Sequence, residues 1–112
     1  MLSKINRLKK QKDIERVFKK GKGLRQGLLL LRFVKNDLRE SRIAFVVSLK
    51  VSKKAALRNK VKRRMREAVK NSLSGIKKGY DIVLTAVPGI ESKGFQEIEE
   101  NINKAFKRAK LL

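Results

Sequence analysis

The sequence predicts an α+β domain in which helices cover a small mixed sheet. Three apolar runs have the length and composition of strands, and three other segments repeat apolar residues at helical spacing. They follow one another as helix, two strands, helix, strand and helix, with no internal repeat and no linker between them. The chain has 112 residues, which is a usual length for one domain. We therefore expect residues 1–112 to form a single domain.

The first predicted element is a helix over residues 11–20. Its apolar residues Ile14, Val17 and Phe18 lie on one side, which is the side that a helix of a small domain buries. Gly21 follows as a typical helix stop. From the residues alone, the glycine-containing stretch that comes next is a short extended connection.

Three segments have the composition of strands. Residues 28–34 form a near-continuous apolar run, which favours a central strand over an edge strand. Residues 43–48 form a second strand, and the polar turn between the two predicts that they pair as antiparallel neighbours. Residues 80–87 form the last strand, closed by Pro88-Gly89.

Two longer helices complete the predicted fold. One spans residues 55–72, and Ser74-Gly75 ends it. The other spans residues 95–110, and its apolar residues at helical spacing are Phe95, Ile98, Ile102, Ala105, Phe106 and Ala109. We expect the helices to cover one face of the sheet and to leave the other face available.

The helix over residues 55–72 combines an apolar stripe with a row of polar and cationic side chains. At about 100° per residue, the apolar arc comprises Leu57, Val61, Met65, Ala68 and Ser72. The adjoining arc, called here the basic row, comprises Arg58, Asn59, Lys62, Arg63 and Arg66. Solvated helix faces normally mix charges of both signs, whereas only Glu67 opposes this row. Such a row of donors suits a phosphate backbone.

The charge of the whole chain points to a polyanionic partner. Lys and Arg number 31 against 10 Asp and Glu, which gives a net charge of +21. RNA, DNA and an anionic membrane surface are the candidate partners. No apolar run reaches the roughly 18 residues of a membrane-spanning helix, and residues 1–12 lack the apolar core of a secretory signal. The absence of Cys is compatible with a reducing compartment, so we expect a cytoplasmic protein without a membrane role.

The residue types that are missing limit the chemistry of the chain. It has no His and no Cys, which removes the commonest general base, the thiolate nucleophile and the usual zinc ligands. The carboxylates are scattered, and the cluster at Glu97, Glu99 and Glu100 lies where it suits the dipole of the last helix. We therefore expect no catalytic residue and no metal ion bound by the protein alone.

The basic row carries a resemblance to a known family. Arg58-Asn59-x-x-Lys62-Arg63-x-x-Arg66-Glu67 resembles the signature helix of the bacterial ribonuclease P protein subunit. Three other blocks are similar to that family in the same order along roughly residues 4–110. They are the first-helix block 6–21, the basic strand-to-loop block 47–53 and the last-strand block 80–83.

The resemblance implies a fold of element order αβββαβα. The family has a left-handed βαβ crossover through the basic helix, against the usual right-handed preference. It also has a short extra strand, which would fall near residues 22–26.

The resemblance also implies a function. Family members bind the large catalytic RNA of ribonuclease P, and together they remove the 5′ leader of precursor tRNA by hydrolysis. The RNA supplies the active site and holds the Mg²⁺ ions, and no obligate protein partner is expected. The basic helix lies against the catalytic RNA, so the residues that inherit this contact by position are Arg58, Asn59, Lys62, Arg63 and Arg66.

A second implied site is the family's central cleft between the first helix and the sheet, which holds the single-stranded leader. Phe18 matches a cleft aromatic, and Ser48 and Lys50 match polar contacts on its floor. Ile14 stands where the family commonly has an aromatic.

One cleft position stays open between two neighbouring residues. Arg32 and Phe33 both fall near a second cleft aromatic, and strand alternation lets only one of them face the cleft; Phe33 is assigned to it. The segment 51–57 is one residue longer than usual in the family.

Two other classes of protein share the basic composition. A ribosomal or RNA-chaperone protein would bind RNA without regard to a tRNA leader. A DNA-architectural protein would prefer duplex DNA and usually carries insertion wedges or a dimer interface, and the sequence contains neither signal.

Overall fold

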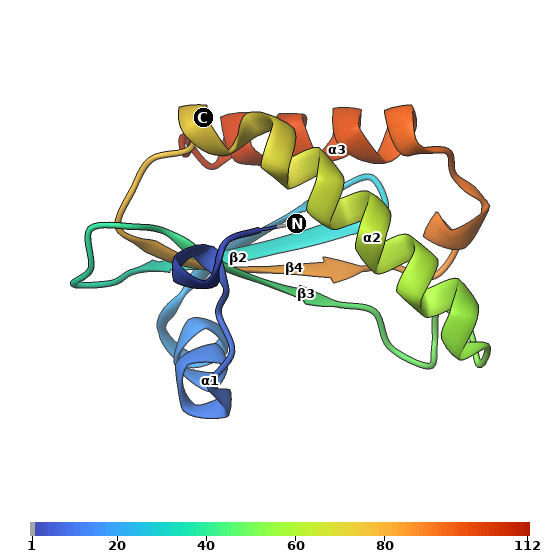
Figure 1. The fold of residues 1–112 in the computed structure, drawn as a ribbon, viewed down its shortest axis with the longest axis horizontal. Coiled ribbons are helices and arrows are strands. Elements are labelled where there is room, and N and C mark those ends of the chain that lie inside the picture. The colour runs from blue at the N-terminus through green and yellow to red at the C-terminus, as the bar shows by residue number, and fades with distance from the viewer. Residues whose placement is uncertain (1) are drawn as a thin grey trace.

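The computed structural model describes residues 2–112 and has one four-stranded sheet with helices on both of its faces (Figure 1). The helices are α1 (Gln11–Lys20), α2 (Ala55–Ser72) and α3 (Phe95–Arg108). The strands are β1 (Lys22–Gln26), β2 (Leu29–Lys35), β3 (Arg42–Val46) and β4 (Tyr80–Ala86). Short 3₁₀ turns lie at Lys4–Asn6, Leu73–Gly75 and Ile90–Ser92.

The order of strands in the sheet is β1-β2-β4-β3. β2 is antiparallel to both of its neighbours, and β3 is parallel to β4, so the sheet is mixed. The prediction that β2 and β3 pair as neighbours is wrong, because β4 lies between them. The reason is burial: Ile82, Val83 and Leu84 of β4 are all fully buried, and only a central strand is covered on both faces.

Helices cover both faces of the sheet. α2 and α3 pack on one face, whereas α1 packs on the other (Figure 1). The expectation that all helices share one face is therefore wrong. The short α1 has its own apolar side, and Val17 on that side is fully buried against Ala44 and Val83 of the sheet.

Most elements follow the sequence predictions closely. The bounds of α1 and α2 are those predicted, and β1 occupies the position implied by the family resemblance. On α2, Val61, Met65 and Ala68 are buried as predicted, while Leu57 and Ser72 are only partly buried. Val69 is fully buried in addition, because α3 lies beside the C-terminal half of α2 and widens the buried stripe.

The N-terminal segment before α1 lies along the outer edge of β3. Arg7 forms a parallel bridge with Ile43, and the Leu8 amide donates to the Ile43 carbonyl at 3.0 Å. Leu2 and Leu8 are both buried. This segment thereby contributes to the site described next, although its sequence has no regular apolar period.

Candidate nucleic-acid interface

The basic row of α2 is accessible in the folded protein. Asn59 and Arg63 are exposed, while Arg58, Lys62 and Arg66 are partly buried. None of the four cations forms an ion pair within residues 2–112. Their charges are therefore available to phosphate groups.

The hydrogen bonds of Arg58 and Arg64 show which side of α2 the basic row occupies. Arg58 donates to the Ser52 carbonyl at 2.9 Å, which holds its side chain against the loop before the helix. Arg64 donates to the Lys93 carbonyl at 2.7 Å and so points toward the segment that precedes α3. Arg64 is thus a structural contact between elements, and the basic row lies on the other side of α2.

The second candidate site is the cleft between α1 and the sheet. Phe18 is 44% exposed at the C-terminal end of α1. The Arg32 guanidinium lies over its ring, 5.6 Å from the centroid, and also donates to the Phe18 carbonyl at 2.9 Å. These contacts hold an exposed aromatic ring beside a positive charge, an arrangement that suits a stacked base of single-stranded nucleic acid.

The floor of this cleft is apolar. It consists of a small buried cluster on the α1 face of the sheet, with Leu8, Val17, Ala44 and Val83 at its centre. Ile14, Val34 and Val46 are partly buried against that cluster. Ile14 therefore presents an aliphatic surface to the cleft.

Phe33 does not lie in this cleft, and its assignment there is wrong. Its side chain packs in the main core with α2 and α3, and its ring meets Tyr80 edge to face at 6.1 Å. Because neighbouring strand residues point to opposite faces, Arg32 is the residue of the pair that faces α1.

Ser48 and Lys50 lie in the loop between β3 and α2. Both are exposed, and the Ser48 hydroxyl accepts from the Lys50 amide at 3.2 Å. Val51 follows them and is buried in the main core, which anchors the loop. Neither polar side chain bonds to α1, and a role for them in the cleft stays a prediction.

An ion-pair network holds α1 on the sheet. Asp81 of β4 is fully buried and accepts from Arg42 at 2.9 and 2.7 Å and from Asn36 at 2.9 Å. From α1, Asp13 lies 3.5 Å from Arg42 and Arg16 lies 3.9 Å from Asp81. The hydrogen bond to Asp81 raises the pKa of Arg42 above its ordinary value, which means that the fold favours the charged guanidinium.

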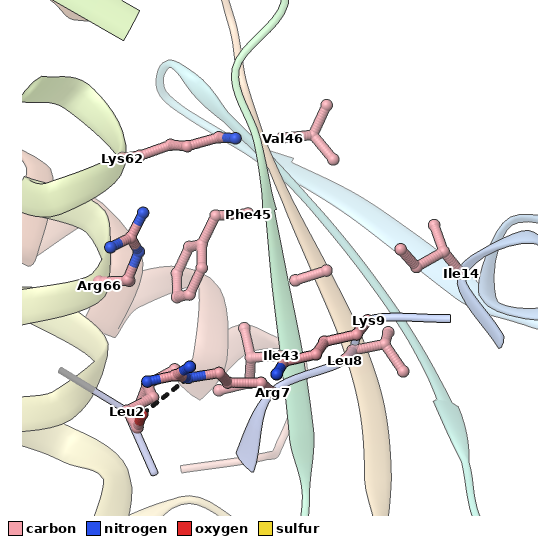
Figure 2. Close-up of a pocket in the computed structure, with 11 residues that line it drawn as sticks. Leu2, Arg7, Leu8, Lys9, Ile14, Ile43, Phe45, Val46, Lys62 and Arg66 are labelled. Atoms are coloured by element: carbon pink, nitrogen blue, oxygen red, sulfur yellow. Dashed lines mark hydrogen bonds between the residues drawn. The ribbon is translucent and has the colours of Figure 1, made fainter. Parts of the chain in front are cut away.

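A pocket of about 440 Å³ lies along the edge of β3, between α2 and α1 (Figure 2). Figure 2 shows Lys62 and Arg66 reaching from α2 toward one side of β3, with Ile14 of α1 on the other side. The lining residues contain four cations and no carboxylate, namely Arg7, Lys9, Lys62 and Arg66.

Sequence reasoning missed Arg7 and Lys9 as members of the site. The block that contains them resembles the family, but nothing in it predicts that the segment pairs with β3. Phe45 and Val46 were likewise placed in a strand without a functional role. The high density of Lys and Arg before α1 was the sequence signal that could have identified Arg7 and Lys9.

Two other kinds of feature are absent from the described part of the chain, a metal-binding group of side chains and a membrane-spanning helix. Residues 2–112 hold no group of three or more His, Cys, Asp or Glu that could bind a metal ion. Asp13 and Asp81 are both ion-paired with Arg42. In the same residues, no helix is long and apolar enough to cross a membrane.

Comparison with known proteins gives one consistent family. A family profile described as Ribonuclease P matches residues 2–110. A curated relative, the ribonuclease P protein component of Alkaliphilus metalliredigens, is 36% identical over 107 residues, with 96% of each chain covered.

Two solved structures share the fold. The Staphylococcus aureus RNase P protein superposes with a TM-score of 0.87 at 30% identity, covering 95% of this chain and 96% of that one. The Thermotoga maritima RNase P protein gives 0.83 at 33% identity, covering 91% and 96%. With a matching profile over nearly the whole length and relatives above 30% identity, the chain belongs to the ribonuclease P protein family.

Proposed function

We propose that this protein, as the protein component of ribonuclease P in tRNA processing, holds the catalytic RNA and the 5′ leader of precursor tRNA at two adjoining surfaces. The basic row of α2 binds the catalytic RNA. The cleft under α1 binds the single-stranded leader, with Phe18 as its stacking surface. The hydrolysis occurs in the RNA partner, and we place the enzyme in the cytoplasm.

The observation that carries this proposal is the arrangement of unpaired positive charge around one strand edge. The basic row lies on one side of β3 and α1 lies on the other, and the pocket of Figure 2, which Lys62, Arg66 and Ile14 help to line, lies between them. One protein molecule can therefore contact two RNA chains at once. A general RNA-binding protein needs the charge, but it does not need an exposed aromatic ring held beside it.

Electrostatics gives the mechanism by which the protein assists cleavage. Two RNA molecules repel each other when they approach, and bound cations lower that repulsion. The protein adds Arg58, Lys62, Arg63 and Arg66 as cations on one helix, so their backbone positions are set before the RNA binds. The leader cleft then tethers the substrate by a part that lies outside mature tRNA.

The Mg²⁺ ions needed for hydrolysis are assigned mainly to the RNA partner. The protein contributes no carboxylate cluster among residues 2–112 that would compete for them. Its role in this proposal is to bind and orient the two RNAs.

The test is cleavage of a precursor tRNA by a bacterial ribonuclease P RNA at low, near-physiological Mg²⁺, with and without the protein. We expect the protein to restore accurate 5′ maturation. Binding to the RNA without any stimulation of cleavage would contradict the proposal and leave a general RNA-binding protein. Mature tRNA, which lacks the leader and is not cleaved, is the matched ligand, and its binding should gain less from the protein.

A further inference from the structure

The outer edge of β3 carries backbone groups that the proposed function does not use. The Ile43 carbonyl accepts from Leu8 and therefore faces away from β4. In a β-ladder, the backbone N–H and C=O groups of residues two apart point to the same side of the strand. Those of Phe45 therefore face away from β4 as well. The N-terminal segment leaves the edge after Leu8, and within residues 2–112 no backbone partner reaches these two groups of Phe45.

The surroundings of this open edge are apolar at the centre and cationic at the rim. The partly buried Phe45 side chain points toward α2, and Val46 points toward α1 (Figure 2). Arg7, Lys9, Lys62 and Arg66 line the same pocket, and none forms an ion pair within the described residues. A volume of about 440 Å³ is in the range of small-ligand pockets.

We propose that this pocket binds one unpaired nucleotide of the catalytic RNA. The N–H and C=O of Phe45 form hydrogen bonds with the edge of the base, and the base packs on the Phe45 side chain. Lys62 and Arg66 on one side and Lys9 on the other bind the flanking phosphates. Proteins read RNA sequence mostly at unpaired bases of this kind, because the grooves of an RNA helix hide the base edges.

The lining favours the catalytic RNA over the leader as the source of the nucleotide. Lys62 and Arg66 belong to the basic row, so the inference rests on the proposed function of that row. Of the leader-cleft residues, only Ile14 lines the pocket, whereas Phe18 and Arg32 do not. The lack of any carboxylate in the lining fits a partner that brings phosphates.

Site-directed photo-crosslinking locates the nucleotide. The chain has no Cys, so Lys9→Cys provides a single attachment point for a photoreactive group, and Lys104→Cys on the exposed side of α3 is the matched control. In the complex of full-length protein, catalytic RNA and precursor tRNA, we expect Lys9→Cys to crosslink one or two adjacent unpaired nucleotides of the catalytic RNA. Crosslinks confined to the leader, or spread along RNA helices, would overturn the proposal.

A coupling experiment then tests the pocket itself. Making that nucleotide abasic should weaken binding of the native protein roughly tenfold, as expected for a lost base-to-aromatic contact. With Phe45→Leu, which keeps an apolar side chain, the same abasic change should cost about threefold or less. An equal loss with both proteins would overturn the pocket.

The two levels of the proposal fail in different ways. If the protein binds the catalytic RNA no more tightly than an unrelated structured RNA, the proposed function itself fails. If it binds the catalytic RNA selectively but no abasic position couples to Phe45, only the nucleotide pocket fails. Thermal unfolding of Phe45→Leu and Lys9→Cys establishes that both variants are folded before either result is interpreted.

Discussion

The two faces of the sheet are built for different purposes. The face under α2 and α3 carries a continuous core, in which Leu29, Leu31 and Phe106 are fully buried. The face under α1 has a cluster of only four buried residues, and an aromatic ring and several cations stay accessible beside it. One face supplies most of the core, and the other leaves side chains accessible to solvent. The difference follows from helix length, since α1 has 10 residues against 18 and 14 for α2 and α3.

The largest expected effect tests the stabilising face. Phe106→Ala should lower the free energy of unfolding by about 3–5 kcal/mol, because it removes a fully buried ring and leaves a cavity. Phe18→Ala is the matched change on the other face and should cost about 0.5 kcal/mol. Urea unfolding of both variants measures the difference, and equal losses would show that the two faces do not differ in the way described.

The next prediction concerns the ion-pair network that holds α1 on the sheet. Asp81→Ala should cost about 3 kcal/mol, since it leaves Arg42 and Asn36 without their buried partner. The raised pKa of Arg42 stabilises the fold at every pH below the ordinary guanidinium value, so this contribution should not titrate between about pH 5 and 9. Denaturant unfolding across that range checks it. Asp37→Ala, in the exposed turn before β3, is the control and should change stability little.

The proposed leader-binding role of the α1 face is tested through Phe18. Phe18→Ala should weaken binding of precursor tRNA with a long leader by about 1–3 kcal/mol, the range for a lost base stack. Leaderless tRNA should bind as before. Dissociation constants of the assembled enzyme for the two substrates give the result, and a similar loss for both would indicate a folding defect instead of a lost contact.

The smallest expected effect on stability concerns the basic row of α2, where substitutions should weaken RNA binding much more than they destabilise the fold. Arg58→Ala and Arg66→Ala should each weaken assembly with the catalytic RNA and reduce the salt dependence of binding by about one phosphate contact. Arg66→Ala should change unfolding little, whereas Arg58→Ala should cost up to about 1 kcal/mol, because it also removes the hydrogen bond to the Ser52 carbonyl. Lys104→Ala on α3 removes the same charge elsewhere. If it weakens assembly equally, total charge matters and the basic row has no special role.

The helices could be predicted from the sequence because their apolar spacing is a local property of each segment. The bounds of α2 depend on one apolar stripe with Val61, Met65 and Ala68, and such periodicity is contained within the helix itself. The order of strands could not be predicted in this way. A short turn between β2 and β3 favours a hairpin locally, but burial of both faces of β4 decides the order, and that is a property of the whole sheet.

The candidate site could be predicted only in part, because some of its residues come together through contacts between distant parts of the chain. The basic row of α2 follows from helical spacing; two of its five residues are exposed and three are partly buried. Arg32 and Phe33 were known to point to opposite faces, but the choice between them needed the register of β2 against β4. Arg7 and Lys9 depend on a bridge to Ile43, far along the chain, for which the sequence has no local signal.

The place of β4 between β2 and β3 also sets an order of folding. During synthesis, β1 and β2 can form their hairpin early, since the contact is local. β3 has no neighbour in the sheet until residues 80–86 have been made, and the N-terminal segment bridges only to β3. A nascent chain therefore carries the complete basic helix while the edge beside it is still missing. The pocket between them forms only when the last strand is inserted, so an incomplete chain has the charge of the finished protein without this pocket.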